Sequence, residues 1–264
     1  MKRNLIILCT SLAILSLVFF GFTNWNYNND EVISSENETT ALNQNIKSET
    51  PDLYYGVDTR FAAVKKSDVH NAATIYDFLN EGEKSQIEQI NSVRITIVKD
   101  NQLSHIEAYG VNEQLTDEQL EILKSTDYFS HFRVRTEFKE KNKETGQLKE
   151  RFFGPHITVT PDKQAVYNDG KEFLINYLIA NSKESLDIIK GDKLGALKIS
   201  FVVTKEGKIE NVKHDAMSTG YPSIDETFMD LIKNIPGEWT PAENSTGDKM
   251  DFEFVFTFGP RDGC

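Results

Sequence analysis

Four phenylalanines alternate with other residues near the C-terminal end of the chain: Phe252, Phe254, Phe256 and Phe258. Successive side chains of a β-strand point to opposite faces, so this spacing places all four rings on one face of a strand. A face made of four aromatic rings is stable only when another element covers it. The sequence therefore predicts an amphipathic strand over residues 252–258, with a helix packed against its aromatic face.

The residues before this strand predict the rest of a small sheet. Residues 197–203 alternate as a strand, residues 205–208 include a glycine suited to a tight hairpin turn, and residues 209–216 return as a second strand. Residues 224–233 have the apolar spacing of a helix, acidic residues near its start, and a break at Pro236. This β-β-α-β order predicts a three-stranded antiparallel sheet with one helix on a face.

A further helix is predicted over residues 171–181, ahead of this unit. The side chains that the strand and helix periodicities turn inward form the predicted core. They are Phe201, Val203, Ile209, Val212, Phe228, Leu231, Ile232, Phe254 and Phe256.

Residues 51–165 repeat the same order in divergent form. A short helix at 73–79 precedes a strand at 93–98, a return strand at 103–109 and a helix at 116–124. The alternative is that β-β-α-β, a common small layout, occurs twice without duplication.

The repeat also predicts how the two units correspond. Residues 156–161 are expected to match residues 255–260, which leaves residues 132–138 as an added strand of the first unit. Thr116 is the predicted N-cap of the first unit's helix. The predicted fold class is α+β: two tandem β-β-α-β units, over residues 51–165 and 166–264, behind an N-terminal apolar helix.

The N-terminal end has the pattern of an export signal. Lys2 and Arg3 precede an apolar run over residues 5–22, which is long enough for a short membrane span. No good cleavage site follows, so residues 1–23 are predicted to be an uncleaved signal anchor, with a cleaved signal peptide as the alternative. Residues 24–50 are polar and rich in asparagine, which predicts a disordered linker.

Charge limits the partners of the chain. It has 41 acidic and 29 basic residues, for a net charge of -12, so a phosphate backbone is repelled and no nucleic acid is expected as a partner. Anionic lipid is repelled as well, which leaves the N-terminal segment as the membrane attachment. Only Cys9 and Cys264 carry thiols; Cys264 is a free thiol, a thiol that forms a disulfide between molecules, or a point of attachment.

No residue pattern points to catalysis. The five histidines have neither metal-ligand spacing nor a nearby cysteine: His70, His105, His131, His156 and His214. The acidic pairs at residues 117–118 and 225–226 open helices, where carboxylates have a structural role. We therefore expect no catalytic, cofactor-binding or metal-binding residues, no cofactor, and a protein that is not an enzyme.

Residues 167–260 resemble the C-terminal domain of TonB-family proteins of the Bacteroidetes type. The matching pieces are residues 168–174, which lead into the helix predicted over residues 171–181, the strand and turn over residues 199–208, the Ile-Asp-Glu of residues 224–226, and the Trp-Thr-Pro-Ala of residues 239–242. Each piece alone is weak, but their order together is fairly specific.

This resemblance implies a periplasmic module anchored in the inner membrane. Such domains bind an extended segment of an outer-membrane receptor by strand addition along the last strand, and some contact inner-membrane motor subunits. In a 2-1-3 sheet the strand over residues 252–258 lies at the edge, where its backbone groups are unpaired. The predicted partner-binding residues are Phe252, Glu253, Val255, Thr257 and Trp239.

Two departures weaken the case for energy transduction in TonB-dependent transport. The linker lacks a long proline-rich spacer and spans only about 30 Å as a coil. The apolar run contains no histidine or other ionisable side chain to couple to a proton-driven motor, apart from Cys9. The alternative function is therefore a structural or assembly protein of the bacterial cell envelope that uses the same fold.

Overall fold

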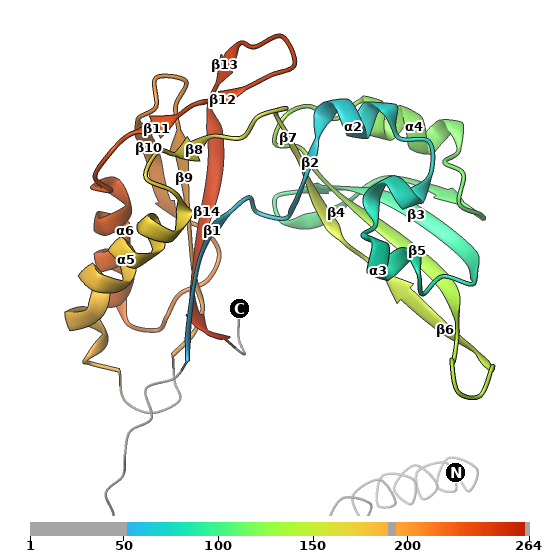
Figure 1. Cartoon of the computed structure of the whole chain (residues 1–264), viewed down its shortest axis with the longest axis horizontal. Helices are drawn as coiled ribbons and strands as arrows, with labels where there is room; N and C mark the ends of the chain where they lie inside the picture. Colours follow the sequence, from blue (N-terminus) through green and yellow to red (C-terminus); the bar gives the residue numbers. More distant parts are fainter. Residues whose placement is uncertain (1–51, 190–193, 262–264) are drawn as a thin grey trace, which may run out of the picture. The chain divides into compact units, whose positions relative to one another are not determined.

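The computed structural model describes residues 52–189 and 194–261, which form a mixed α+β fold built on two main sheets (Figure 1). The predicted signal anchor, the linker and Cys264 lie outside the described residues, so these remain predictions. Within the described ranges, no helix is long and apolar enough to cross a membrane.

The C-terminal sheet has four antiparallel strands in the order β1 (Leu53–Asp58), β14 (Phe252–Pro260), β9 (Leu197–Val203) and β10 (Ile209–His214). The turn between β9 and β10 contains Gly207, whose φ of 78° is a conformation that glycine adopts without steric cost. The residues of this turn are those that the sequence predicted.

Two helices pack on the aromatic face of this sheet, α5 (Lys171–Leu186) and α6 (Pro222–Lys233) (Figure 1). Two short strand pairs complete this half of the chain. They are β8 (Val166–Tyr167) with β11 (Trp239–Thr240), and β12 (Ala242–Glu243) with β13 (Lys249–Met250).

The centre of this core is an aromatic cluster between α6 and β14. The ring of Phe228 lies 4.4 Å from that of Phe258 and 5.0 Å from that of Phe256, measured between centroids. The predicted core is confirmed for six residues, which are buried: Phe201, Val203, Phe228, Ile232, Phe254 and Phe256. The other three are partly buried and pack against it: Ile209, Val212 and Leu231.

The N-terminal sheet has six strands. Five follow the order β2 (Ala62–Lys65), β7 (His156–Thr160), β5 (His131–Lys141), β3 (Gln89–Lys99) and β4 (Gln102–Gly110), while β6 (Leu148–Phe153) pairs with β5. The other elements are helices: α2 (Lys66–Asn71), η1 (Ile75–Phe78), α3 (Glu81–Lys84) and α4 (Asp117–Lys124).

The predicted start of α4 is confirmed in detail. The Thr116 hydroxyl accepts a hydrogen bond from the Gln119 backbone N–H, and the Gln119 side chain accepts one from the Thr116 N–H. Both N-terminal donors are thereby satisfied, which is the capping-box arrangement. The amide of Gln119 also donates to the backbone carbonyl of Val93 on β3, so the cap joins the helix to the sheet.

Both sheets contain a hairpin, a helix and a third strand that lies antiparallel beside the first strand of the hairpin. These are β3-β4-α4-β5 and β9-β10-α6-β14. The predicted three-stranded sheets are wrong, because each sheet recruits strands from elsewhere in the chain. The pair β2–β7 is also parallel rather than antiparallel. Whether the two units arose by duplication stays a prediction.

Two further expectations for the first unit are wrong. Strand β7 pairs with β5 and not with β3, so β5 holds the position equivalent to β14, and residues 156–161 do not. Residues 156–161 and 255–260 were expected to correspond because each is a strand-like segment that ends in a proline, and this pattern does not determine strand order. The predicted helix over residues 73–79 is only the short 3-10 helix η1.

His131, at the start of β5, lies beside charged groups from other elements. Burial and, to a lesser extent, the positive charge of Arg60 lower the pKa of His131 from its usual 6.5 to about 4, while Asp215 acts in the opposite direction. Arg60 Nη2 lies 2.7 Å from Asp215 Oδ2. The neutral imidazole is therefore favoured where β5 meets this ion pair.

We expect Phe256→Ala to lower the free energy of unfolding by about 3–5 kcal/mol, because the substitution leaves a cavity between α6 and the sheet. Phe256 has no solvent exposure. The matched control is Phe173→Ala on α5, where 52% of the side chain is exposed; it should cost about 1 kcal/mol or less. Denaturant unfolding measures both, and equal costs would mean that the register of β14 is wrong.

We also expect stability to fall as pH drops from 7 to 5.5. The unfolded chain binds a proton on His131 more readily than the folded chain, because the folded pKa is about 4. His156, whose pKa is also lowered by burial and by Arg133, adds to the effect. His131→Gln should reduce the change of melting temperature with pH over this range, whereas His105→Gln, at an exposed position, should not. An unchanged slope in His131→Gln would contradict the assignment.

Candidate functional site

Strand β14, the predicted partner-binding strand, is paired along both edges. Its residues from Phe252 to Phe258 pair with β9, and those from Val255 to Pro260 pair with β1 on the other side (Figure 1). The prediction that residues 252–258 lie at the edge of the sheet is therefore wrong. A row of unpaired backbone groups beside an aromatic core is costly, and β1 satisfies it with a strand from the opposite end of the described chain.

Strand β1 is held by side chains as well as by its backbone. Val57 is buried in the core, and the ring of Tyr55 lies 5.0 Å from that of Phe258 and 6.0 Å from that of Phe228. The hydroxyls of Tyr55 and Ser182 on α5 lie 3.3 Å apart. Burial raises the pKa of Tyr55, although the hydrogen bond with Ser182 acts against it. β1 is thus an integral strand of the sheet.

Two of the predicted partner-binding residues belong to the core rather than to a surface. Phe252 has no exposure, and Trp239 is 7% exposed. The Trp239 ring packs against those of Tyr167, Phe201 and Phe254, with centroid distances of 5.2 to 6.1 Å. Its indole N–H has no acceptor among the described residues. Trp239 therefore presents no exposed surface of the kind that a partner anchor needs.

The remaining predicted residues, Glu253, Val255 and Thr257, lie on the sheet face away from the helices. Val255 is only 5% exposed, so the expectation of an open face is wrong at that residue. It pairs with Ser200 on β9 and with Asp58 on β1. Because Val255 has a strand on each side, a proline there removes a hydrogen bond within the sheet.

Val255 and Thr257 line a cleft of about 470 Å³, which we call the strand-face cleft. It lies over β1, β14 and β9 and is lined by Tyr54, Gly56, Asp58, Thr59, Arg60, Lys198, Val255, Thr257 and Arg261. Gly56 has a structural reason to be glycine, because a Cβ there would contact the Tyr54 side chain that folds over it. Glu253 lines a second cleft, of about 380 Å³, beside β10.

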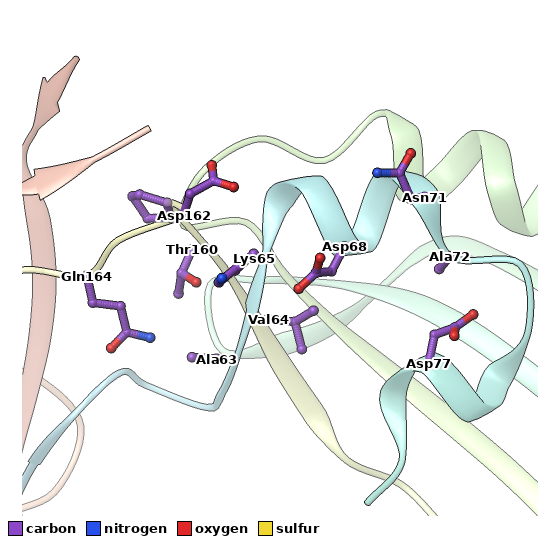
Figure 2. Close-up of a pocket in the computed structure, with 11 residues that line it drawn as sticks. Ala63, Val64, Lys65, Asp68, Asn71, Ala72, Asp77, Thr160, Asp162 and Gln164 are labelled. Carbon is purple, nitrogen blue, oxygen red and sulfur yellow. The ribbon is translucent and has the colours of Figure 1, made fainter. Parts of the chain in front are cut away.

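A third cleft, of about 570 Å³, lies beside α2 and carries three carboxylates (Figure 2). Asp162 accepts a hydrogen bond from the Ser67 hydroxyl at 2.9 Å. Burial raises the pKa of Asp77, but hydrogen bonds from the backbone N–H groups of Thr74 and Ala73 outweigh it and leave the pKa below its usual value. Asp77 therefore caps η1, and its carboxylate is committed to the fold.

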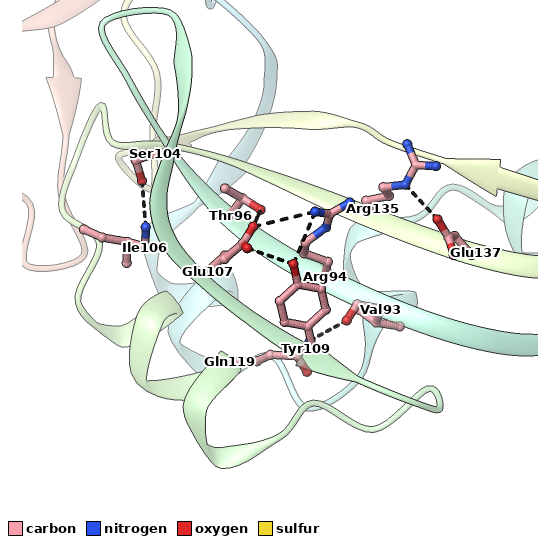
Figure 3. A network of polar contacts seen from close by, with 10 residues as sticks. All are labelled: Val93, Arg94, Thr96, Ser104, Ile106, Glu107, Tyr109, Gln119, Arg135 and Glu137. Carbon is pink, nitrogen blue, oxygen red and sulfur yellow. Dashed lines mark hydrogen bonds and ion pairs between the residues drawn. The ribbon is translucent and has the colours of Figure 1, made fainter. Parts of the chain in front are cut away.

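A polar network covers part of the outer face of the N-terminal sheet (Figure 3). The Tyr109 hydroxyl donates to Glu107 at 2.8 Å and accepts from Arg94 at 3.3 Å, while Thr96 also donates to Glu107. Arg94 and Glu107 are 3.8 Å apart. These side chains come from β3 and β4, so the network joins the two strands of the hairpin.

Glu137 belongs to the same face and is similarly held in place. A hydrogen bond from Arg135 is the main reason that the pKa of Glu137 lies below its usual range, with a second from Ser92. A carboxylate stabilised in its charged form is poorly suited to act as a general acid. Across residues 52–189 and 194–261, no three His, Cys, Asp or Glu side chains form a group that could hold a metal ion.

Strand β1 lines the strand-face cleft and fills the edge of β14, and the sequence did not predict it. Residues 53–58 contain the signal, since Tyr55 and Val57 alternate with Tyr54, Gly56 and Asp58. The segment is short and far from its partner strand in the sequence, so no local pattern assigns it to the C-terminal sheet. Comparison of the chain with protein families, with curated proteins and with solved structures finds no match.

Proposed function

We propose that this protein is a membrane-anchored, partner-binding module of the bacterial cell envelope, similar to TonB C-terminal domains, whose strand-accepting edge is β14. One observation carries the proposal: an extended segment distant in sequence, β1, pairs antiparallel with β14 over six residue pairs. An edge that holds one added strand through its backbone can hold another whose alternate side chains fit the same core.

The partner is an extended segment that replaces β1 in this proposal. Its backbone takes over the pairs now made by Leu53 to Asp58, and its inward side chains occupy the places of Tyr55 and Val57. The covalent link to the rest of the chain gives β1 a high effective concentration at β14, so an outside segment must bind with enough affinity to displace it. Partner binding is therefore controlled by β1.

Attachment to the envelope rests on the sequence of the N-terminal end. Lys2 and Arg3 before the apolar run support export with the C-terminal region in the periplasm. An outer-membrane receptor segment suits the position of β1, since such segments are extended. The proposal does not include energy transduction, because the apolar run has no histidine or carboxylate to couple to motor subunits.

A structural or assembly protein of the envelope is the second candidate. The β1–β14 pairing also supports this second candidate, because a β14 edge that β1 occupies permanently cannot pair with a strand of a partner. The two candidates differ in one property that can be measured, namely whether β1 leaves β14.

We expect a disulfide between β1 and β14 to abolish partner capture if β1 must leave. Asp58 and Val255 are register partners on the sheet face away from the helices, so Asp58→Cys with Val255→Cys suits a disulfide. Cys9 and Cys264 are replaced by serine, and a photo-crosslinking residue is placed at Thr257. The full chain, made in its own cells, should give an envelope-protein adduct that oxidation removes and dithiothreitol restores.

Single Asp58→Cys serves as the control and should give the adduct under both conditions. An adduct that still forms when the disulfide between β1 and β14 is oxidised means that the partner does not use β14. If no adduct forms even with reduced cysteines, the structural candidate is the better one.

We also expect a tagged full chain to sediment with the membrane fraction and to resist carbonate extraction, because residues 5–22 are apolar and no good cleavage site follows. Recovery from the cytosol would contradict export itself. A soluble periplasmic chain that begins near residue 24 would contradict only the anchor. Replacing two leucines of the apolar run by arginine is the control and should abolish membrane recovery.

A further inference from the structure

The strand-face cleft has an unusual charge for this protein. The chain has 41 acidic and 29 basic residues, yet the cleft is lined by three cationic side chains, Arg60, Lys198 and Arg261, and one anionic side chain, Asp58. Three cationic side chains at one concave surface supply N–H donors for an anion in a protein whose overall charge is negative. The cleft therefore differs from its surroundings in the ligands that it favours.

Most charges around the cleft already have partners. Arg60 lies 2.7 Å from Asp215 and 3.8 Å from Glu253, and Arg261 lies 2.7 Å from Asp52. The one acid in the lining, Asp58, is 2.5 Å from the ammonium of Lys171 on α5. These pairs hold the two guanidinium groups in position at the cleft, and they leave Asp58 neutralised from the helix side.

Lys198 is the exception. Its side chain is half-buried on β9, and among the described residues no carboxylate lies within 4.0 Å of its ammonium group. A lysine ammonium in a cleft that has no protein carboxylate beside it is free to make charge-assisted hydrogen bonds to a bound anion.

Neutral donors surround Lys198. Thr257 on β14 is its register partner across the sheet, on the same face, so the two Cβ atoms are about 4.5–5.5 Å apart. Tyr54 folds over Gly56 on the neighbouring strand and brings its hydroxyl to the same cleft. Hydroxyls beside cationic groups are the donors that phosphate and carboxylate oxygens accept from.

We propose that the strand-face cleft binds a small dianionic ligand through its phosphate or carboxylate oxygens, with Lys198 as the main charged contact and Thr257 beside it. Arg60 and Arg261 are already ion-paired, so they add further N–H donors rather than net positive charge, and these donors beside Lys198 suit the second charged group of a dianion. The volume of about 470 Å³ is large enough for a small molecule. The site is formed with β1 in place, so it does not depend on strand exchange at β14.

The test is calorimetric titration of the detergent-solubilised full chain with inorganic phosphate and, separately, with succinate, at pH 7.5 and constant ionic strength. Acetate is the singly charged comparison. Lys198→Gln should weaken binding by about ten- to a hundredfold, as expected for the loss of a hydrogen bond to a charged group. Lys198→Arg should retain most of the binding. Thr257→Val should also weaken binding, and it is the second test variant if Lys198→Gln fails to fold.

The matched control is Lys249→Gln, which makes the same charge change at an exposed residue of β13 and should leave binding unchanged. Binding of phosphate alone or of succinate alone, dependent on Lys198, supports the proposal and identifies the oxyanion. Binding of neither dianion overturns it, as does binding that Lys198→Gln and Lys249→Gln weaken equally. A crosslink at β14 that persists or fails in the strand-exchange experiment has no bearing on this result.

Discussion

The antiparallel pairing of β1 with β14 is the interaction on which the C-terminal half of this protein depends. It turns β14 from an edge strand into an interior strand, so that the aromatic face made by Phe256 and Phe258 is supported from both sides. Tyr55 and Val57 then extend that face beneath the helices. The pairing also fixes where the chain leaves the sheet, which places Arg60 beside Asp215 and Glu253.

The elements with strong local periodicity were the ones that the sequence predicted well. Strand β9, the turn at Gly207, helix α6 and the aromatic alternation of β14 each carry their signal within about ten residues, and the Thr116 cap does so within four. Strand order is a different kind of information. It depends on pairs distant in sequence, and the alternation of residues 156–160 is equally compatible with pairing to β3 or to β5.

The candidate site was predicted less well, for a related reason. Sequence alternation correctly placed Glu253, Val255 and Thr257 on one face of β14, but it did not reveal that β1 lies beside them or that Val255 is buried. No sequence pattern identifies Lys198 as a residue of a binding site. Its interest comes from the absence of a nearby carboxylate among the described residues, which is a property of the folded arrangement and not of any segment.

The order of β1 and β14 along the chain has a consequence for biogenesis. The first described strand and the last are neighbours in one sheet, so this sheet has a large sequence separation between contacting residues, which slows folding. During synthesis β1 is made before β14, and it has no partner at that edge until the segments between the two strands have also been made. Until β14 has been made, the aromatic face of this sheet cannot be completed, and loss of residues 252–260 removes an interior strand rather than a tail.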